Sequence, residues 1–120
     1  MSAKQIIQEL YKSDALINGT ILDTFLHPEV ILDWNSSKGF IQMNRKELLD
    51  FANVLGKAYV RSKVKISHIL KEGNSVSVRY SHYIKTIENP REEMLLAHII
   101  VIWELKDDKL FRGYQMSQSS

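Results

Sequence analysis

The chain contains no cysteine, which excludes a disulfide framework, thiolate zinc sites and cysteine nucleophiles. It also lacks the run of about 18 apolar residues that a membrane-spanning helix requires. The most apolar stretch, Met94 to Trp103, is interrupted by His98. The first ten residues mix charged and apolar side chains, unlike the continuous apolar segment of a signal peptide. We therefore expect a cytoplasmic protein with no membrane partner.

An excess of charge of one sign is also missing. Sixteen basic and fourteen acidic residues leave a net charge of +2, and no block of about five or six like charges occurs. A glycine-rich phosphate loop, a serine-nucleophile elbow, a dinucleotide fingerprint and a metal-ligand spacing are all absent. These absences predict no nucleic-acid partner, no cofactor and no bound metal.

The composition is that of one ordinary globular domain. The chain has 120 residues, of which 44% are hydrophobic and 25% charged. This length suits a single hydrophobic core and is too short for two ordinary ones. We expect one domain over residues 1–120.

The first half of the chain has the periodicity of helices. Apolar residues recur at three- and four-residue spacing from about Ser2 to Ile17, which predicts a helix with one buried face. Asn18-Gly19 is predicted to end that helix, and a short second helix should stop near His27-Pro28. The branched and aromatic run Val30 to Trp34 predicts a short strand, bounded by the segment 35–39.

A third helix is predicted by a capping box, in which Asn44 precedes Glu47 by three residues. A buried apolar stripe follows, and Gly56 is predicted to end the helix. Beyond it the period changes from about four to two, as in β-strands. Four strands are expected, near 64–70, 76–84, 94–105 and 110–116.

The strand from Met94 to Leu105 is apolar on both of its faces. One face can pack against the helices. The other, carrying Leu96, Ile100 and Ile102, needs a different cover. A second copy of the chain would supply it, so we expect a homodimer.

This order of elements resembles the nuclear transport factor 2-like superfamily, including its SnoaL-like and ketosteroid isomerase-like branches. The resemblance covers essentially the whole chain. It implies an α+β cone in which N-terminal helices pack on a strongly curved, mixed and mainly antiparallel β-sheet. The local similarities lie in Phe25 to Asp33, in Gly39 with Asn44 to Leu49, and in Asp107 to Leu110 with Tyr114 to Ser117.

Two residues are candidates for proton transfer. The resemblance places Asp33 where ketosteroid isomerases keep their base, and a carboxylate in an apolar pocket can have a raised pKa. Alternatively, Asp33 caps the loop that follows it. His82 shares a strand face with apolar residues and should line the cavity, as a catalyst or as a hydrogen-bonded core residue. The remaining residues predicted to line the pocket are Tyr11, Trp34, His68, Tyr80, Trp103 and Gln115.

The sequence also departs from the patterns of the superfamily. The second oxyanion donor of the isomerases would align near Val101, where no acid is present. The acidic base of SnoaL-type cyclases would align near Gln115 to Gln118, which are uncharged. Asp33 and His82 with either His68 or His98 would resemble the Asp and two His of scytalone dehydratase.

Two functions remain open from the sequence. The first is a pocket protein that binds or acts on a small, largely apolar molecule, with isomerase-, dehydratase- or cyclase-like proton transfer. The second is a noncatalytic dimeric module that binds a ligand or another protein.

Overall fold

Six β-strands form one mixed sheet that curls around the helices. The structure is a computed structural model and describes residues 1–120. In chain order the strands are β1 (Leu26–Ser36), β2 (Gly39–Asn44), β3 (Tyr59–Glu72), β4 (Ser75–Thr86), β5 (Met94–Lys106) and β6 (Lys109–Ser119). They lie side by side in the order β2-β1-β6-β5-β4-β3. Neighbouring strands are antiparallel except β1 and β6, which are parallel.

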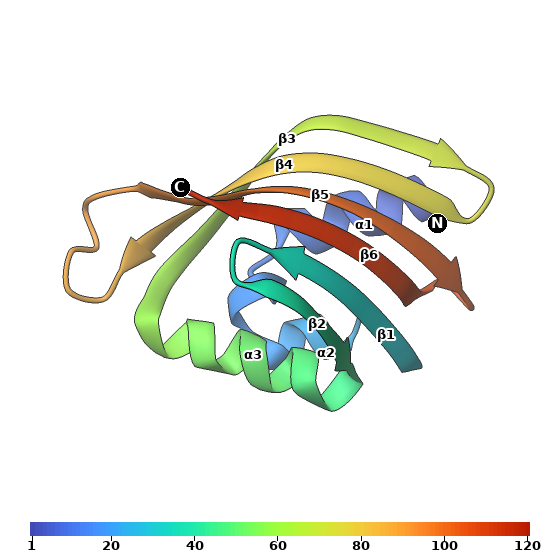
Figure 1. The fold of residues 1–120 in the computed structure, drawn as a ribbon, viewed down its shortest axis with the longest axis horizontal. Coiled ribbons are helices and arrows are strands. Elements are labelled where there is room, and N and C mark those ends of the chain that lie inside the picture. Colours follow the sequence, from blue (N-terminus) through green and yellow to red (C-terminus); the bar gives the residue numbers. More distant parts are fainter.

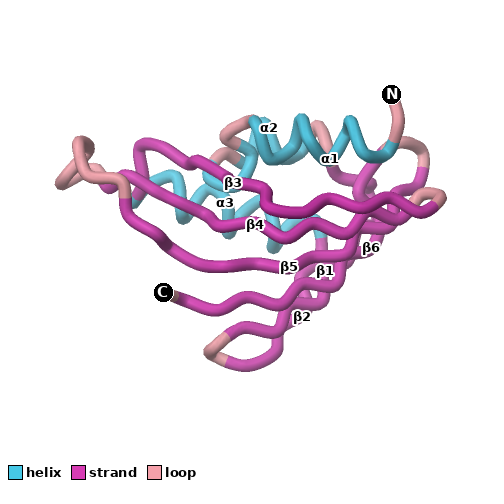
Figure 2. The backbone as a smooth tube through the Cα atoms, turned by 90° about the horizontal axis from the view of Figure 1, so that it is seen from above, coloured by secondary structure: helices cyan, strands magenta, loops and turns pink.

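The helices cover the concave face of this sheet, as Figures 1 and 2 show. They are α1 (Ala3–Lys12), the 3₁₀ turn η1 (Ala15–Ile17), α2 (Gly19–Asp23) and α3 (Arg45–Ala58). The sheet is strongly curled but not closed (Figure 1). The predicted fold class, helices packed on a curved, mainly antiparallel sheet, is therefore confirmed.

The core lies between these two layers. Twenty buried residues from the helices and from five of the strands form one hydrophobic cluster. Along β4, and along β5 from Ile99 onward, buried residues alternate with more accessible ones, which gives each strand one face toward the helices. Both longer helices begin with a capping box, Ser2 with Gln5 in α1 and the predicted Asn44 with Glu47 in α3.

The N-terminal helix is shorter than predicted. The Ser13 hydroxyl donates to the carbonyl of Leu10 and accepts from the amide of Ala15, at 2.7 and 3.2 Å. This local pairing competes with helical hydrogen bonds, so α1 ends at Lys12. Asn18 then begins α2 by accepting from the Ile21 amide, whereas we expected it to end a helix.

The first strand is longer than predicted and has an unpredicted partner. His27 and Pro28 lie inside β1 rather than at the end of a helix. Gly39, at a positive φ of 112°, turns the chain back into β2, which pairs with β1 along its outer edge. The predicted loop therefore contributes a hairpin, and this hairpin supplies one wall of the cavity described below.

Irregularities in β3 and β5 change which side chains face the core. The pairing of β3 with β4 shifts between Ile66 and His68, so residues beyond this bulge exchange faces. In β5 a similar shift brings Leu96 to the inner side, where it lines the cavity. We had expected Leu96 on the outer face with Ile100 and Ile102, which are indeed exposed.

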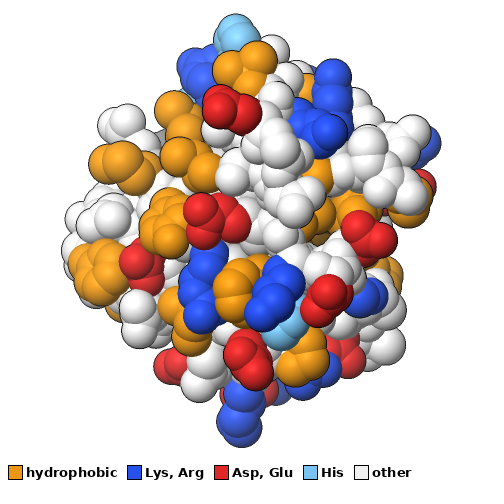
Figure 3. All heavy atoms as spheres, turned by 90° about the vertical axis from the view of Figure 1, so that its right-hand side faces the viewer, with side chains coloured by type: hydrophobic (Ala, Val, Ile, Leu, Met, Phe, Trp, Pro, Cys, Tyr) orange, Lys and Arg blue, Asp and Glu red, His pale blue; other side chains and the backbone are white.

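None of the helices has the length and apolar character needed to cross a membrane. The end of the molecule that carries the β3–β4 and β5–β6 turns displays acidic and basic side chains side by side (Figure 3). No single-sign patch dominates this view. That distribution agrees with the small net charge of the chain.

Candidate functional site

A cavity of about 490 Å³ lies between the helices and the concave face of the sheet. Nineteen of its 26 lining residues are hydrophobic. Three of the lining residues are exposed, namely Lys38 and Gly39 at the β1–β2 turn and Ser119 at the end of β6. The cavity therefore opens at the end of the cone where the C-terminus lies (Figure 1). The cavity has the size and apolar lining of a small-molecule site.

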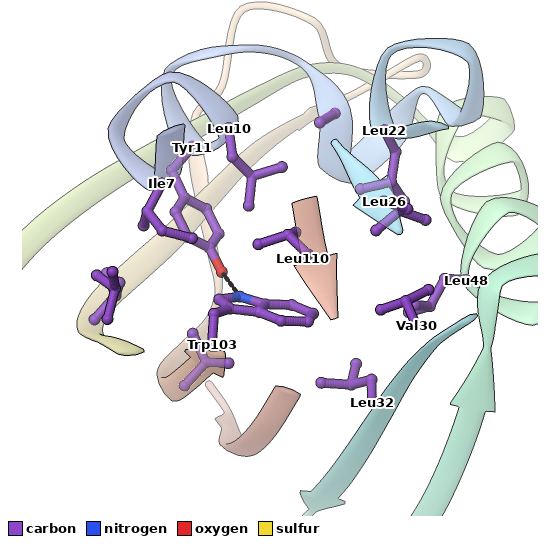
Figure 4. Close-up of a cluster of buried hydrophobic side chains, with 14 of the residues drawn as sticks. Ile7, Leu10, Tyr11, Leu22, Leu26, Val30, Leu32, Leu48, Trp103 and Leu110 are labelled. Atoms are coloured by element: carbon purple, nitrogen blue, oxygen red, sulfur yellow. Dashed lines mark hydrogen bonds between the residues drawn. The ribbon is translucent and has the colours of Figure 1, made fainter. Parts of the chain in front are cut away.

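Aromatic side chains form the inner end of the cavity. The Trp103 indole donates a buried hydrogen bond of 2.9 Å to the Tyr11 hydroxyl, shown by the dashed line in Figure 4. Leu10, Leu26 and Leu110 also line this region, and Figure 4 shows them around the same space. An indole N–H can only donate, so the Tyr11 oxygen is the acceptor.

The two buried tyrosines of this region are neutral. The rings of Tyr11 and Tyr80 lie with their centroids 4.6 Å apart. Burial raises the pKa of Tyr11 to about 12, although the hydrogen bond from Trp103 acts in the opposite direction. Burial also raises the pKa of Tyr80 well above its ordinary value. The inner end thus presents uncharged phenols among apolar walls.

His82 lines the cavity from β4 and is 5% exposed. Its Nε2 lies 2.7 Å from the Ser62 hydroxyl on the neighbouring strand β3. Burial lowers the pKa of His82 to about 4, because desolvation disfavours the imidazolium. In the sheet, His82 pairs with Ala97, which pairs with Ser119. The small Ala97 side chain leaves room beside the neutral imidazole.

Strand β6 provides a polar stripe in the same sheet wall of the cavity, two strands away from β4. The stripe consists of every second residue of the strand, Gln115, Ser117 and Ser119, which share its inner face and line the cavity. The Ser117 hydroxyl accepts a 2.7 Å hydrogen bond from the Trp34 indole. The Trp34 ring rests edge-to-face on Phe51 of α3, with centroids 5.4 Å apart. The Gln115 amide has no side-chain partner within the protein and can serve a ligand.

Five of the six residues that we predicted for the pocket line it, namely Tyr11, Trp34, Tyr80, Trp103 and Gln115. His82, which we predicted as catalytic, also lines it. The other two predicted site residues, Asp33 and His68, do not.

Asp33 lies on the outer face of the sheet. Its neighbours in β1, Leu32 and Trp34, point into the cavity, so the side chain between them points away. The Asp33 carboxylate accepts a 2.9 Å hydrogen bond from Gln42 of β2. The predicted convergence of Asp33 and His82 in one cavity is therefore not found.

His68 is exposed because of the bulge in β3. It pairs with Arg79, an outward residue of β4, while the next residue, Ile69, packs against the core. Its Nδ1 contacts the Ser67 hydroxyl at 3.0 Å. His98 is also exposed, and its Nδ1 contacts Ser81 at 2.9 Å. Neither Asp33, His68 nor His98 therefore lies in the cavity with His82, so the resemblance to the Asp and two His of scytalone dehydratase is not found in the structure.

Sequence reasoning missed Ser62, Phe51 and Ser117 as parts of the site. Ser117 could have been found from parity, because it lies two residues after Gln115 on the same strand. Ser62 and Phe51 depend on contacts between elements, for which the local sequence holds no signal.

No group of three or more His, Asp or Glu side chains in the structure is placed to bind a metal ion.

The curled sheet with three helices on its concave face is the nuclear transport factor 2-like fold. No protein-family model matches the sequence, and no curated protein sequence matches it either. The similarity to solved structures is nevertheless extensive and covers almost the whole chain.

Three solved structures illustrate the fold. IdmH from Streptomyces antibioticus, a candidate polyketide cyclase, has a TM-score of 0.73 at 13% identity, covering 98% of this chain and 92% of that one. A protein with a ketosteroid isomerase-like fold from Catenulispora acidiphila has a TM-score of 0.69 at 11% identity, covering 92% and 82%. An NTF2-like protein of unknown function from Burkholderia pseudomallei has a TM-score of 0.67 at 13% identity, covering 96% and 90%. At these identities the likeness establishes the fold alone.

Proposed function

We propose that this protein binds a small, neutral, largely apolar molecule in the cavity between helices and sheet. The observation that carries the proposal is the cavity itself, about 490 Å³ with 19 hydrophobic residues among the 26 that line it. Apolar lining with a few polar groups is the usual composition of a small-molecule site.

A neutral ligand is favoured over a charged one. The only charged side chain that lines the cavity is Lys38, an exposed residue of the β1–β2 turn at its opening. Deeper inside, His82 is neutral at physiological pH and both buried tyrosines are protonated. An ion placed there would lose its hydration without gaining a counter-charge, which is costly.

Proton-transfer chemistry of the isomerase, dehydratase or cyclase type stays a prediction. His82 is available to a ligand, but a pKa of about 4 makes its neutral form a weak base. Asp33 lies outside the cavity and cannot assist it there. The geometry therefore supports binding more strongly than catalysis.

The expected cytoplasmic location likewise stays a prediction.

The experiment compares neutral and charged probes that share one ring system. We expect fluorene and 9-fluorenone to raise the melting temperature, and fluorene-9-carboxylate to have little effect, because ligands that bind only the folded state stabilise it. Ala97→Phe should occupy part of the space beside His82 and reduce the shifts. Ser81→Ala, on the outer face beside His98, is the control. Failure of every neutral probe to bind, or equal binding by the Ala97→Phe variant, would contradict the proposal.

We also propose that the chain forms a homodimer through the outer face of β5 and β6. Ile100 pairs across the strands with Met116, and Ile102 pairs with Tyr114. All four are exposed, with 53% of Ile100 and 66% of Met116 accessible. Such a contiguous apolar patch on a sheet is typical of an interaction surface.

The charges around this patch favour a second copy of the chain as its cover. The outward-facing neighbours include two basic residues, Arg79 and Arg112, and two acidic ones, Asp33 and Glu104. In an isologous interface the same patch meets itself after a two-fold rotation, so a patch that carries charges of both signs can pair them with opposite charges of the second copy. A noncatalytic dimeric module remains the alternative function if the cavity binds no ligand.

A further inference from the structure

The hydrogen bond between Trp34 and Ser117 determines whether the Ser117 hydroxyl donates to or accepts from a ligand. The indole Nε1 is a donor without lone pairs available, so at 2.7 Å the Ser117 oxygen must be the acceptor. A serine hydroxyl carries one proton of its own. Ser117 makes no second side-chain hydrogen bond within the protein, and it lines the cavity. Its proton is therefore free for a ligand.

The position of this hydroxyl is set by four elements, β1, α3, β5 and β6. Trp34 comes from β1, and its ring is supported by Phe51 of α3. Ser117 comes from β6, which runs parallel to β1 and pairs Trp34 with Gln115. On its other side Ser117 pairs with Ile99 of β5. The oxygen is thus held in place, and the bond from Trp34 also polarises its O–H group toward stronger donation.

We propose that Ser117 is a ligand-binding residue that donates a hydrogen bond to an acceptor oxygen, and that Trp34 positions it. This inference rests on the proposed function and specifies the ligand class. The ligand is a neutral, mainly hydrocarbon molecule that carries an acceptor oxygen, for which an aromatic ketone serves as the probe. The acceptor oxygen lies against β6, and the hydrocarbon part lies against the apolar walls.

The test uses fluorene and 9-fluorenone, which share one ring system and differ in the carbonyl group. We expect the wild-type protein to bind fluorenone about fivefold more tightly than fluorene, as for one net hydrogen bond. Ser117→Ala should abolish this preference while fluorene binding is retained. The carbonyl stretching band of bound fluorenone should lie at lower frequency in the wild type than in Ser117→Ala.

Further variants separate the loss of the ligand hydrogen bond from the effect of leaving the Trp34 N–H unpaired. Ser117→Ala leaves the Trp34 N–H without a partner, so the double variant Trp34→Phe with Ser117→Ala removes both polar groups. Trp34→Phe alone should reduce the fluorenone preference less than Ser117→Ala, because the hydroxyl remains but is no longer oriented. Ser81→Ala, which removes a hydroxyl from the outer face, should keep the preference and the infrared shift.

The outcomes distinguish this inference from the proposed function. Equal binding of both probes by the wild type, or a fluorenone preference that survives in Ser117→Ala and in the double variant, would overturn the role of Ser117 and leave the apolar cavity intact. Binding of neither probe would overturn both. A carbonyl band unchanged by Ser117→Ala would also count against the hydrogen bond.

Discussion

His82 shows how burial sets the chemistry of a single residue. Its side chain packs in the wall of the cavity and its Nε2 contacts Ser62. Desolvation lowers its pKa from 6.5 to about 4. The structure therefore favours the neutral imidazole, which serves as a hydrogen-bonding group at physiological pH.

This shift predicts a pH dependence of stability. Between pH 6.5 and about 4 the unfolded chain binds a proton at His82 that the folded protein does not. The free energy of unfolding should therefore fall as the pH is lowered through this window, by about 3 kcal/mol in total, and be unaffected by His82 above it. Urea unfolding of the wild type and of His82→Gln, at pH 7 and pH 5, measures the part of this loss above pH 5, about 2 kcal/mol.

The expected result is a smaller loss of stability on acidification in His82→Gln than in the wild type. Asp33→Asn is the matched control, because Asp33 faces away from the cavity. That variant should leave the pKa of His82, followed by NMR, unchanged. An equal pH dependence of wild type and His82→Gln would show that His82 titrates normally in the folded protein.

The buried bond between Trp103 and Tyr11 leads to a second prediction for single residues. Tyr11→Phe removes the acceptor and leaves a buried indole N–H unpaired. This should lower the free energy of unfolding by about 1–3 kcal/mol. Tyr59→Phe, which removes a cavity-lining hydroxyl without a protein partner, should cost less. Chemical denaturation of both variants provides the measurement, and equal effects would contradict the importance of the bond.

At the scale of elements, Gly56 determines how closely α3 approaches the N-terminal segment. We expected this glycine to end the helix, but α3 continues to Ala58. A Cβ added at Gly56 would lie 2.4 Å from the carbonyl oxygen of Ile17 in η1. The glycine therefore permits a close contact between two elements rather than a helix end.

The effect of Gly56→Ala follows from a comparison of magnitudes. In an isolated helix this change would stabilise the protein by about 1 kcal/mol. Here the backbone of η1 or α3 must shift to accommodate the methyl group, at a cost of about 1–3 kcal/mol. We expect a net loss of stability in thermal unfolding. An increase in melting temperature would show that the two elements separate easily.

Sequence periodicity predicted most elements but not the details of their faces. The capped third helix and the four long strands were expected from local spacing, and the structure contains them. Side chains alternate between the two faces of a strand, so one inserted residue moves all the following residues to the opposite face. The bulge in β3 moved His68 outward in this way. Asp33 and Trp34 are adjacent in a strand, so both could not face one cavity.

At the scale of the whole molecule, the apolar patch on β5 and β6 predicts an assembly that one substitution can disrupt. Ile100→Glu would place an unpaired charge at the centre of the proposed interface, and should weaken dimerisation by roughly 100-fold. Ile87→Glu is a closely matched control, because Ile87 is 54% exposed against 53% for Ile100 and lies outside the patch. Sedimentation measures the oligomeric state of both variants.

The expected result is a dimer for the wild type and Ile87→Glu and a monomer for Ile100→Glu. A monomeric wild type at concentrations of tens of micromolar would contradict the proposed dimer. A dimer that persists in Ile100→Glu would place the interface on another surface. Neither outcome affects the proposed cavity, whose lining does not include Ile100.

The amino-acid sequence alone indicated most helices and strands, because periodicity, capping and turn residues act over a few positions, and the resemblance of their order to the nuclear transport factor 2-like superfamily implied the class of fold. It also indicated His82 and five other residues of the 26 that line the cavity, and for those on strands the side follows from regular alternation. Only the tertiary structure decided the β1–β2 hairpin, the outward positions of Asp33 and His68, and the contacts of Ser62 and Phe51. Those features depend on strand register and on packing between elements distant in the chain, where local patterns have no influence.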